Sequence, residues 1–214
     1  MATVELANAM GAKVIAGVSS KEKGALPTLA GASKVLIYGR DQESYKKFKD
    51  DVKSTAAKLG HPKGMLSFVF TLTRLPNEMP HSCLHVNRIL GCSIIVDVVH
   101  GDLFQHALLS CIEPLGKICL VGFVAGQRPI KPGLLLVKEA IVVGSLWGRW
   151  ARENTLAFRN NMNDILNFME NGLIEPRADN VIMVEDYAKA FELFENNAGR
   201  GNTVICFKSD ASKL

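Results

Sequence analysis

Residues 92–123, which read CSIIVDVVHGDLFQHALLSCIEPLGKICLVGF, decide the fold of this chain. An apolar run at 92–99 is followed by a helical pattern at 101–116, which Pro114 and Gly116 end, and by a second apolar run at 116–123. Strands that are apolar at nearly every position are buried on both faces, as in a parallel sheet. Two such strands joined by a helix predict a parallel pair with a crossover helix.

The same alternation of strand-like and helix-like segments continues on both sides of this stretch. Strand-like runs occupy 12–18, 33–39, 140–148 and 202–207, and helical patterns occupy 41–60, 151–172 and 184–197. The helix at 41–60 carries one apolar stripe, spaced by three and four residues: Tyr45, Phe48, Val52 and Ala56. For the helix at 184–197 we expect a buried stripe of Tyr187, Phe191 and Phe194. The pattern predicts an α/β fold with a doubly wound, Rossmann-like parallel sheet, ending in a polar tail at 208–214.

One segment, 61–90, does not fit this alternation. A connection of about 30 residues is far longer than the 2–6 residues usual in α/β units, so we interpret it as an atypical insertion. Its apolar part, 65–72, could form an extra edge strand or an interface patch. His81, Cys83 and His85 form a cluster whose two histidines, four residues apart, could present zinc ligands on one helix face. No second cluster accompanies them, so a polar patch is favoured and no metal site is predicted.

The composition of the 214 residues excludes several classes of protein. The net charge of +4 is spread along the chain without a dense basic run, which argues against a nucleic-acid partner. No apolar run reaches the 18–20 residues that cross a bilayer, and the start lacks a secretory signal. The five cysteines include no CxxC pair, which is typical of reduced thiols. We expect a cytoplasmic protein, with a mitochondrial location left open.

Four segments in order resemble the medium-chain dehydrogenase/reductase superfamily. They are GAKVIAGVSSKEK (11–23), LAGASKVLIYG (29–39), the stretch from IIVDVV to GFVAG (94–126) and LLLVKEAIVVGSLWG (134–148). Within that superfamily the chain is most similar to the zinc-independent quinone oxidoreductase (zeta-crystallin-like) branch. The resemblance covers 4–60 and 91–207. It implies an oxidoreductase that uses NADPH to reduce quinones or α,β-unsaturated carbonyls by hydride transfer, with no protein nucleophile and hence no identified catalytic residue.

The end of the strand at 12–18 favours NADPH over NADH. NAD-binding domains place an acidic residue there for the ribose hydroxyls. This chain has Ser19 and Ser20, followed by Lys21 and Lys23, and hydroxyls with ammonium groups suit a 2′-phosphate. By position in the resemblance, Ser19, Ser20, Lys23 and Tyr38 are the candidate adenosine-phosphate contacts. A solvated helix start for the lysines and a core-packing role for Tyr38 remain alternatives.

The resemblance also assigns residues near the nicotinamide ring. Gly122, Phe123 and Val124 belong to the loop that approaches the ring, and Trp147 and Gly148 would line the pocket beside it. The alternatives are an ordinary turn for the loop and a core position for the tryptophan. His100 stands where the family pattern has glycine, and we expect it to contact the cofactor or to be exposed, without a partner that would make it a base.

Two parts of the family pattern are not found before the helix VELANAMGA (4–12), namely the first strand with its GGVGxxA turn and the preceding substrate domain. We therefore expect residues 1–207 to form an incomplete dinucleotide-binding domain with weak or no turnover. The vacated place would expose both neighbouring strands unless 65–72 or another chain fills it. Alternative functions are a non-catalytic interaction module and a nucleotide-binding subunit. A homodimer through 140–148 is also expected from the resemblance.

Overall fold

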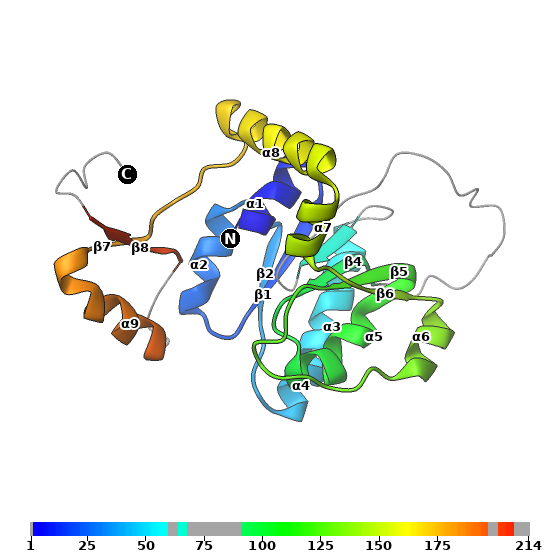
Figure 1. Ribbon diagram of the computed structural model, residues 1–214. Helices are drawn as coiled ribbons and strands as arrows, with labels where there is room; N and C mark the ends of the chain where they lie inside the picture. The colour runs from blue at the N-terminus through cyan, green and yellow to red at the C-terminus, as the bar shows by residue number, and fades with distance from the viewer. Residues whose placement is uncertain (1, 60–63, 68–90, 197–200, 208–214) are drawn as a thin grey trace. The chain divides into compact units, whose positions relative to one another are not determined.

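The computed structural model describes residues 2–59, 64–67, 91–196 and 201–207 (Figure 1). They fall into two compact units, residues 1–174 and 175–214. The first unit contains a six-stranded sheet in which every pair of neighbours is parallel. Its strands are β1 (Lys13–Val18), β2 (Lys34–Ile37), β3 (Gly64–Ser67), β4 (Cys92–Asp97), β5 (Ile112–Leu120) and β6 (Ile141–Gly144). This confirms the predicted Rossmann-like α/β class.

The strand order is β2-β1-β3-β4-β5-β6, so β3 lies in the middle of the sheet. It pairs with β1 from Lys13↔Gly64 to Ala16↔Ser67 and with β4 at Leu66↔Ile95. The hypothesis that the segment from 65 fills the central place is confirmed for the described residues up to 67, and the edge-strand alternative is wrong. The exposure of the two neighbouring strands, expected only if that place stayed empty, therefore does not arise, because each has a backbone partner in β3. Residues 68–72 lie outside the described residues.

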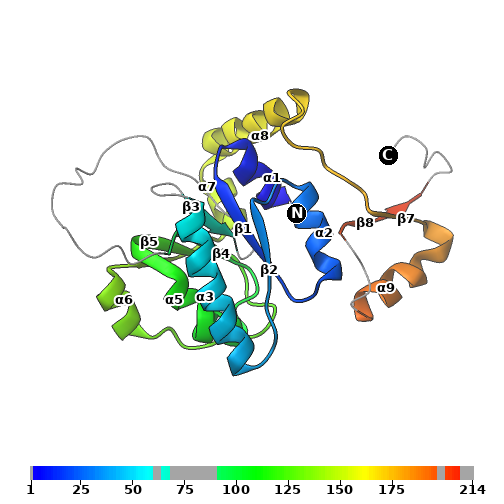
Figure 2. The same cartoon turned by 180° about the vertical axis from the view of Figure 1, so that it is seen from behind.

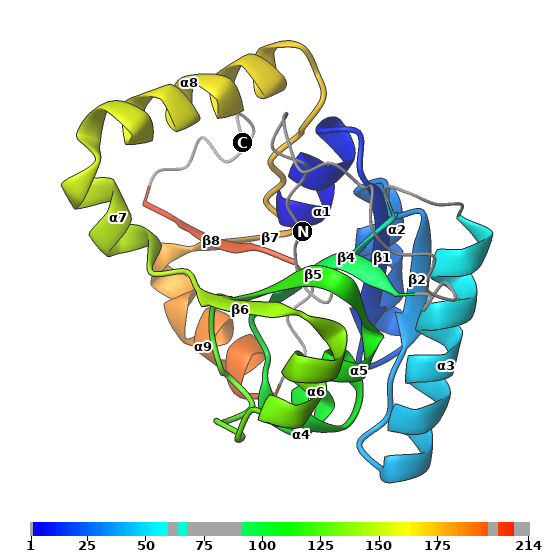
Figure 3. The ribbon, with the colours of Figure 1, turned by 90° about the vertical axis from the view of Figure 1, so that its right-hand side faces the viewer.

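Helices cover both faces of this sheet (Figure 2). In β1, Ile15 faces the cluster formed with α3 (Gln42–Lys58), while Val14 and Ala16 face the cluster formed with α1 (Ala2–Ala9). Tyr45, Phe48 and Val52 are buried on α3, as the stripe predicts. The α3 side also holds α5 (Leu109–Cys111) and α6 (Pro132–Lys138), which Figure 3 shows beside β5 and β6.

The remaining helices of the first unit differ in detail from the sequence prediction. The predicted helix 101–116 is shorter and irregular: α4 (Gly101–Leu103), a π-helical segment η2 (Phe104–Leu108) and α5, after which β5 already begins at Ile112. The predicted strand 140–148 ends at Gly144. The predicted helix 151–172 is two helices, α7 (Trp147–Glu153) and α8 (Thr155–Glu170), which meet at the non-helical Asn154. A 3-10 turn η1 (Glu22–Gly24) leads into α2 (Ala25–Leu29).

The second unit contains a parallel pair, β7 (Asn180–Met183) and β8 (Thr203–Cys206), with η3 (Val184–Asp186) and α9 (Tyr187–Glu195) between them. The prediction of a buried aromatic stripe on α9 is wrong. Tyr187, Phe191 and Phe194 are 57, 60 and 69% exposed, and Ala190 is the only buried residue of this helix in the described chain. The helical period was read correctly, but a two-stranded sheet covers little of the helix.

Two further findings concern the described residues as a set. No helix among them is long and apolar enough to span a bilayer. Their four cysteines form no disulfide: Cys92, Cys111, Cys119 and Cys206. Burial raises the pKa of the Cys111 thiol to about 12, so this thiol is protonated and packs as a small apolar side chain at neutral pH.

Candidate functional site

The carboxyl ends of the strands meet at one edge of the sheet because all pairs are parallel. Backbone hydrogen bonds continue past the strand ends there. Tyr38 N donates to Val18 O at 2.9 Å, Val121 N to Asp97 O at 2.8 Å, and Ser145 N to Leu120 O at 2.8 Å. The segments after β1 and β2 are thus joined at this edge, and so are those after β4, β5 and β6. We call these segments the rim, and they contain every predicted site residue.

Ser19 and Tyr38 are brought together at the end of β1 and β2. The Ser19 side chain lies near the Tyr38 hydroxyl group, and the Tyr38 ring packs edge-on against Phe48 with centroids 6.1 Å apart. Burial raises the pKa of Tyr38, and the neighbouring Tyr45 raises it further. The Arg40 guanidinium and the Ser19 side chain act in the opposite direction on this pKa. The hydroxyl pair thus stays protonated at neutral pH and can donate to an anion.

The basic residues of the same corner come from two elements. Lys23 belongs to η1, which ends at Gly24. A Cβ on Gly24 would lie 3.5 Å from Val35 of β2 and 4.0 Å from Val18 of β1, so this turn packs against both strands. Ser20 and Lys21 join β1 to that turn. Arg40 was missed by the sequence reasoning, although it follows directly on the quoted strand end IYG. No carboxylate occurs in 17–21, so the residues present fit a phosphate better than a pair of ribose hydroxyls.

The loop after β5 carries Gly122, Phe123 and Val124 at the opposite side of the rim. A Cβ on Gly122 would lie 3.1 Å from the Val98 carbonyl oxygen, so glycine is favoured there. Gly126 has φ +87°, a conformation that glycine adopts without strain. Phe123 and Val124 are 59 and 85% exposed. The two glycines allow the loop to fold tightly over the end of β4 while its apolar tip faces outward.

Trp147 and Gly148 begin α7, just beyond the end of β6. The indole of Trp147 packs edge-on against Phe158 of α8, with centroids 5.6 Å apart, and is 60% exposed. A Cβ on Gly148 would meet only the Arg152 side chain, at 3.9 Å, so no steric reason for glycine exists in the described chain. These two residues lie on the rim, but their contacts are with α7 and α8.

Asp97 and His100 form a buried pair after β4, which corrects the expectation that His100 has no partner. His100 Nδ1 lies 3.1 Å from Asp97 Oδ2, and the Asp97 Oδ1 accepts hydrogen bonds from the backbone N–H of Val99 and His100. Burial raises the pKa of Asp97, and the hydrogen bonds from His100 partly offset this. The sequence signal was visible: a histidine at a glycine position, three residues after a buried aspartate.

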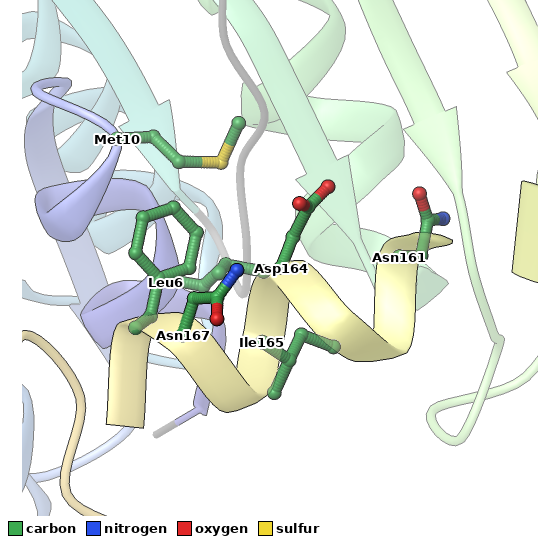
Figure 4. Close-up of a pocket in the computed structure, with 7 residues that line it drawn as sticks. Leu6, Met10, Asn161, Asp164, Ile165 and Asn167 are labelled. Atoms are coloured by element: carbon green, nitrogen blue, oxygen red, sulfur yellow. The ribbon is translucent and has the colours of Figure 1, made fainter. Parts of the chain in front are cut away.

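A pocket of 390 Å³ lies away from this rim, between α1 and α8 (Figure 4). Leu6 and Met10 line it from α1, and Asp164, Ile165 and Phe168 line it from α8. None of the predicted cofactor contacts is among its lining residues. In the described part of the chain, no group of three or more His, Cys, Asp or Glu side chains could hold a metal ion, and His81, Cys83 and His85 lie outside it.

The parallel sheet, the helices on both its faces and the rim at its carboxyl edge define a Rossmann-like fold. The sequence profile of the family described as zinc-binding dehydrogenase matches residues 1–166. The chain therefore belongs to that family. This confirms the resemblance to the medium-chain dehydrogenase/reductase superfamily, while zinc independence stays a prediction.

Curated relatives are quinone oxidoreductase-like proteins. The Nematostella vectensis protein named quinone oxidoreductase-like protein 2 homolog is 29% identical over 208 residues, which cover 96% of this chain and 47% of the relative. The Bos taurus quinone oxidoreductase-like protein 2 is 30% identical over 119 residues, 55% of this chain and 34% of the relative. The chain thus spans between a third and a half of the length of these relatives.

Solved structures show the same fold. The Escherichia coli quinone oxidoreductase complexed with NADPH superposes with a TM-score of 0.64 at 18% identity, covering 94% of this chain and 52% of that one. A Pseudomonas syringae quinone oxidoreductase superposes with a TM-score of 0.65 at 19% identity, covering 94% and 51%. The family relationship supports a generic oxidoreductase ancestry for the chain.

Proposed function

We propose that this chain binds NADPH at the carboxyl edge of its six-stranded sheet and acts in the reduction of quinones or related α,β-unsaturated carbonyls. The observation that carries the proposal is the meeting of the Ser19 and Tyr38 hydroxyl groups at the ends of β1 and β2, with Arg40 close behind, at the strand end where NAD recognition needs a carboxylate. The complex with NADPH of the Escherichia coli quinone oxidoreductase supports the choice of cofactor.

In this proposal each part of the rim has a separate task. Ser19 and Tyr38 donate hydrogen bonds to the 2′-phosphate, and Ser20, Lys23 and Arg40 complete its surroundings with a hydroxyl group and two positive charges. The loop of Gly122, Phe123 and Val124 covers the nicotinamide end, and Trp147 and Gly148 border the pocket there. Bound NADPH supplies the hydride, and the protein supplies binding and orientation.

The test is a fluorescence titration of the purified chain with NADPH and with NADH. We expect tighter binding of NADPH. Lys23→Ala should weaken NADPH binding about 10- to 100-fold, as a lost charge-assisted contact does. Lys13→Ala is the matched control, because Lys13 is an exposed lysine at the start of β1, and Ser19 follows the opposite end of that strand.

A second variant tests the choice between the two cofactors. Ser19→Asp introduces the carboxylate that suits ribose hydroxyls and repels a phosphate, so it should reverse the preference toward NADH. Equal affinity of the native chain for both dinucleotides, with no effect of Ser19→Asp, would contradict the phosphate assignment. Circular dichroism of each variant checks that the fold is retained.

A nucleotide-binding module without turnover is the second candidate function. An assay of NADPH oxidation with a simple quinone separates the two functions. Binding with turnover supports the reductase, and binding without turnover supports the module. A homodimer through 140–148 and a cytoplasmic location belong to the same proposal.

A further inference from the structure

His100 holds an unusual backbone conformation between β4 and α4, with φ 59° and ψ −132°. Glycine would adopt this conformation without steric cost, whereas a residue with a Cβ is strained there. The side chain is nevertheless retained and is 94% buried, since His100 is 6% exposed. A strained residue persists only where contacts with its surroundings offset the strain, so the contacts of the imidazole ring indicate what this conformation is kept for.

Three contacts fix the ring. Nδ1 lies 3.1 Å from Asp97 Oδ2, Nε2 lies 3.1 Å from the Arg128 carbonyl oxygen, and the ring stacks on Phe104 with centroids 4.2 Å apart. A carbonyl oxygen can only accept a hydrogen bond, so Nε2 carries a proton. The ring therefore joins the end of β4 to Arg128 through both of its nitrogen atoms.

The bond to Arg128 closes the loop at 121–128. The loop starts with Val121 N donating to Asp97 O at 2.8 Å. In its middle, Ala125 N donates to Val99 O at 2.9 Å, and Gly126 O accepts from Gly101 N at 3.0 Å. At its far end the His100 ring bonds to the backbone, while Arg128 Nε forms an exposed ion pair with Asp102 Oδ1 at 2.7 Å. A partly buried hydrogen bond constrains such an end more than an exposed ion pair does.

We propose that His100 is a positioning residue that clamps the loop 121–128 against the end of β4 and so fixes Gly122, Phe123 and Val124 for the cofactor. The inference rests on the proposed function for its cofactor part. His100 acts through the loop and does not itself touch the cofactor, because both ring nitrogen atoms are already engaged with the protein. Asp97 orients the ring through Nδ1, and the Arg128 carbonyl oxygen accepts the hydrogen bond from Nε2.

The first experiment is hydrogen–deuterium exchange of the full chain. His100→Gly removes the ring and relieves the backbone strain, and His100→Ala removes the ring and keeps the strain. In both variants we expect the amides of Gly101 and Ala125 to exchange at least about 10-fold faster than in the native chain, because their bonds open more often. Asp102→Asn is the control: it removes only the exposed ion pair and should leave these amides unchanged.

Chemical rescue tests whether the two ring nitrogen atoms, rather than the volume of the side chain, hold the loop. Free imidazole can enter the space left in His100→Gly and bond to Asp97 and Arg128 through both nitrogen atoms. It should restore slow exchange, and it should restore the NADPH affinity that we expect this variant to lose by about 10-fold. 1-Methylimidazole has one nitrogen blocked and should restore neither.

The outcomes separate the clamp from the cofactor assignment. Unchanged exchange at Gly101 and Ala125 in both His100 variants would overturn the clamp. Faster exchange with unchanged NADPH affinity would overturn the positioning role. A native chain that binds no NADPH would refute the proposed function and with it the cofactor part of the inference, while the exchange data would still decide the clamp.

Discussion

Lys138 lies at the last position of α6 with its ammonium group inside the protein. Only 8% of the residue is exposed, and Nζ donates a hydrogen bond to the carbonyl oxygen of Ile112 at 2.8 Å. Burial lowers the pKa of this amine below its ordinary 10.5, and the charge of Lys53 lowers it further. The folded chain therefore holds the lysine proton less tightly than the unfolded chain does.

This difference predicts a stability that depends on pH. At pH values between the folded pKa of Lys138 and 10.5, the unfolded chain binds more protons than the folded chain. The contribution of Lys138 to the free energy of unfolding therefore increases as the pH rises. Lys138→Met removes the gain and leaves the Ile112 carbonyl without its partner, at a cost of about 1–3 kcal/mol. Urea unfolding between about pH 8 and about pH 10 should show the native chain gaining on the variant. Lys131→Met, at an exposed lysine, is the control. A difference in the free energy of unfolding between the native chain and Lys138→Met that stays constant over this pH range would contradict this account.

Individual residues also show where sequence reasoning about the site succeeded and where it stopped. The meeting of Ser19 and Tyr38 followed from two parallel strands that end at the same edge. The pairing of His100 with Asp97 was missed, although the histidine stands three residues after a buried aspartate, because the contact needs a positive φ at a residue that rarely adopts it. The roles of Trp147 and Gly148 were assigned by resemblance and stay predictions.

At the scale of the element, α3 begins with a side-chain cap. Asp41 precedes the helix in an extended conformation, and its carboxylate accepts from Ser44 N at 2.8 Å and from Ser44 Oγ at 2.7 Å. These hydrogen bonds hold the pKa of Asp41 below its ordinary 3.8. The cap satisfies one of the free amide groups that every helix has in its first turn.

We predict that Asp41→Ala lowers the Tm of the chain at neutral pH. Because the folded pKa is depressed, the stabilisation by ionised Asp41 is present above pH 3.8 and is lost as the pH falls through the folded value. The Tm difference between native chain and variant should shrink in that range. Asp41→Asn keeps the oxygen acceptor without the charge, so its Tm at neutral pH should lie between those of the native chain and Asp41→Ala, and the Tm difference between the two variants should not vary with pH there. A Tm loss for Asp41→Ala that is equal at neutral and acidic pH would refute the charge contribution.

The type of most elements could be predicted, because periodicity depends on which side of a segment is buried. The stripe of α3 and the apolar run of β4 are examples. The division of the helix at Asn154 and the π-helical segment at Phe104–Leu108 could not be predicted, because they depend on local backbone geometry that periodicity does not record. The exposure of Phe191 depends on what covers α9, which no pattern within that helix reveals.

At the scale of the whole molecule, β6 ends the strand order of the six-stranded sheet. The side chains of Ile141 and Val143 are 51 and 47% exposed, and Leu136 of the neighbouring α6 is 80% exposed. An edge strand with exposed β-branched side chains offers free backbone groups and apolar area to another strand. These features support the proposed homodimer through 140–148.

We predict that Ile141→Lys shifts the chain from dimer toward monomer, because a lysine on an edge strand opposes pairing with a second copy. Light scattering coupled to size-exclusion chromatography measures the mass. Leu29→Lys adds the same charge at an exposed leucine of α2, outside 140–148, and it should leave the dimer intact. A native chain that runs as a monomer at all concentrations would rule out this interface.

The placement of β3 was one of several hypotheses that the sequence left open. An apolar segment of about the right length can pair wherever a backbone edge is free, so composition alone could not choose between the middle and the edge of the sheet. The parallel registers with β1 and β4 decide it.

This strand order also bears on how the chain assembles during translation. Each new strand can dock on an edge that is still open: β2 on one side of β1, then β3, β4, β5 and β6 in succession on the other. No pair of strands that has already formed must separate to let a later strand insert between them. At the usual rate of synthesis, the second edge of β1 waits about 2–9 s for β3 to leave the ribosome. In that interval the nascent polypeptide is most exposed to chaperones.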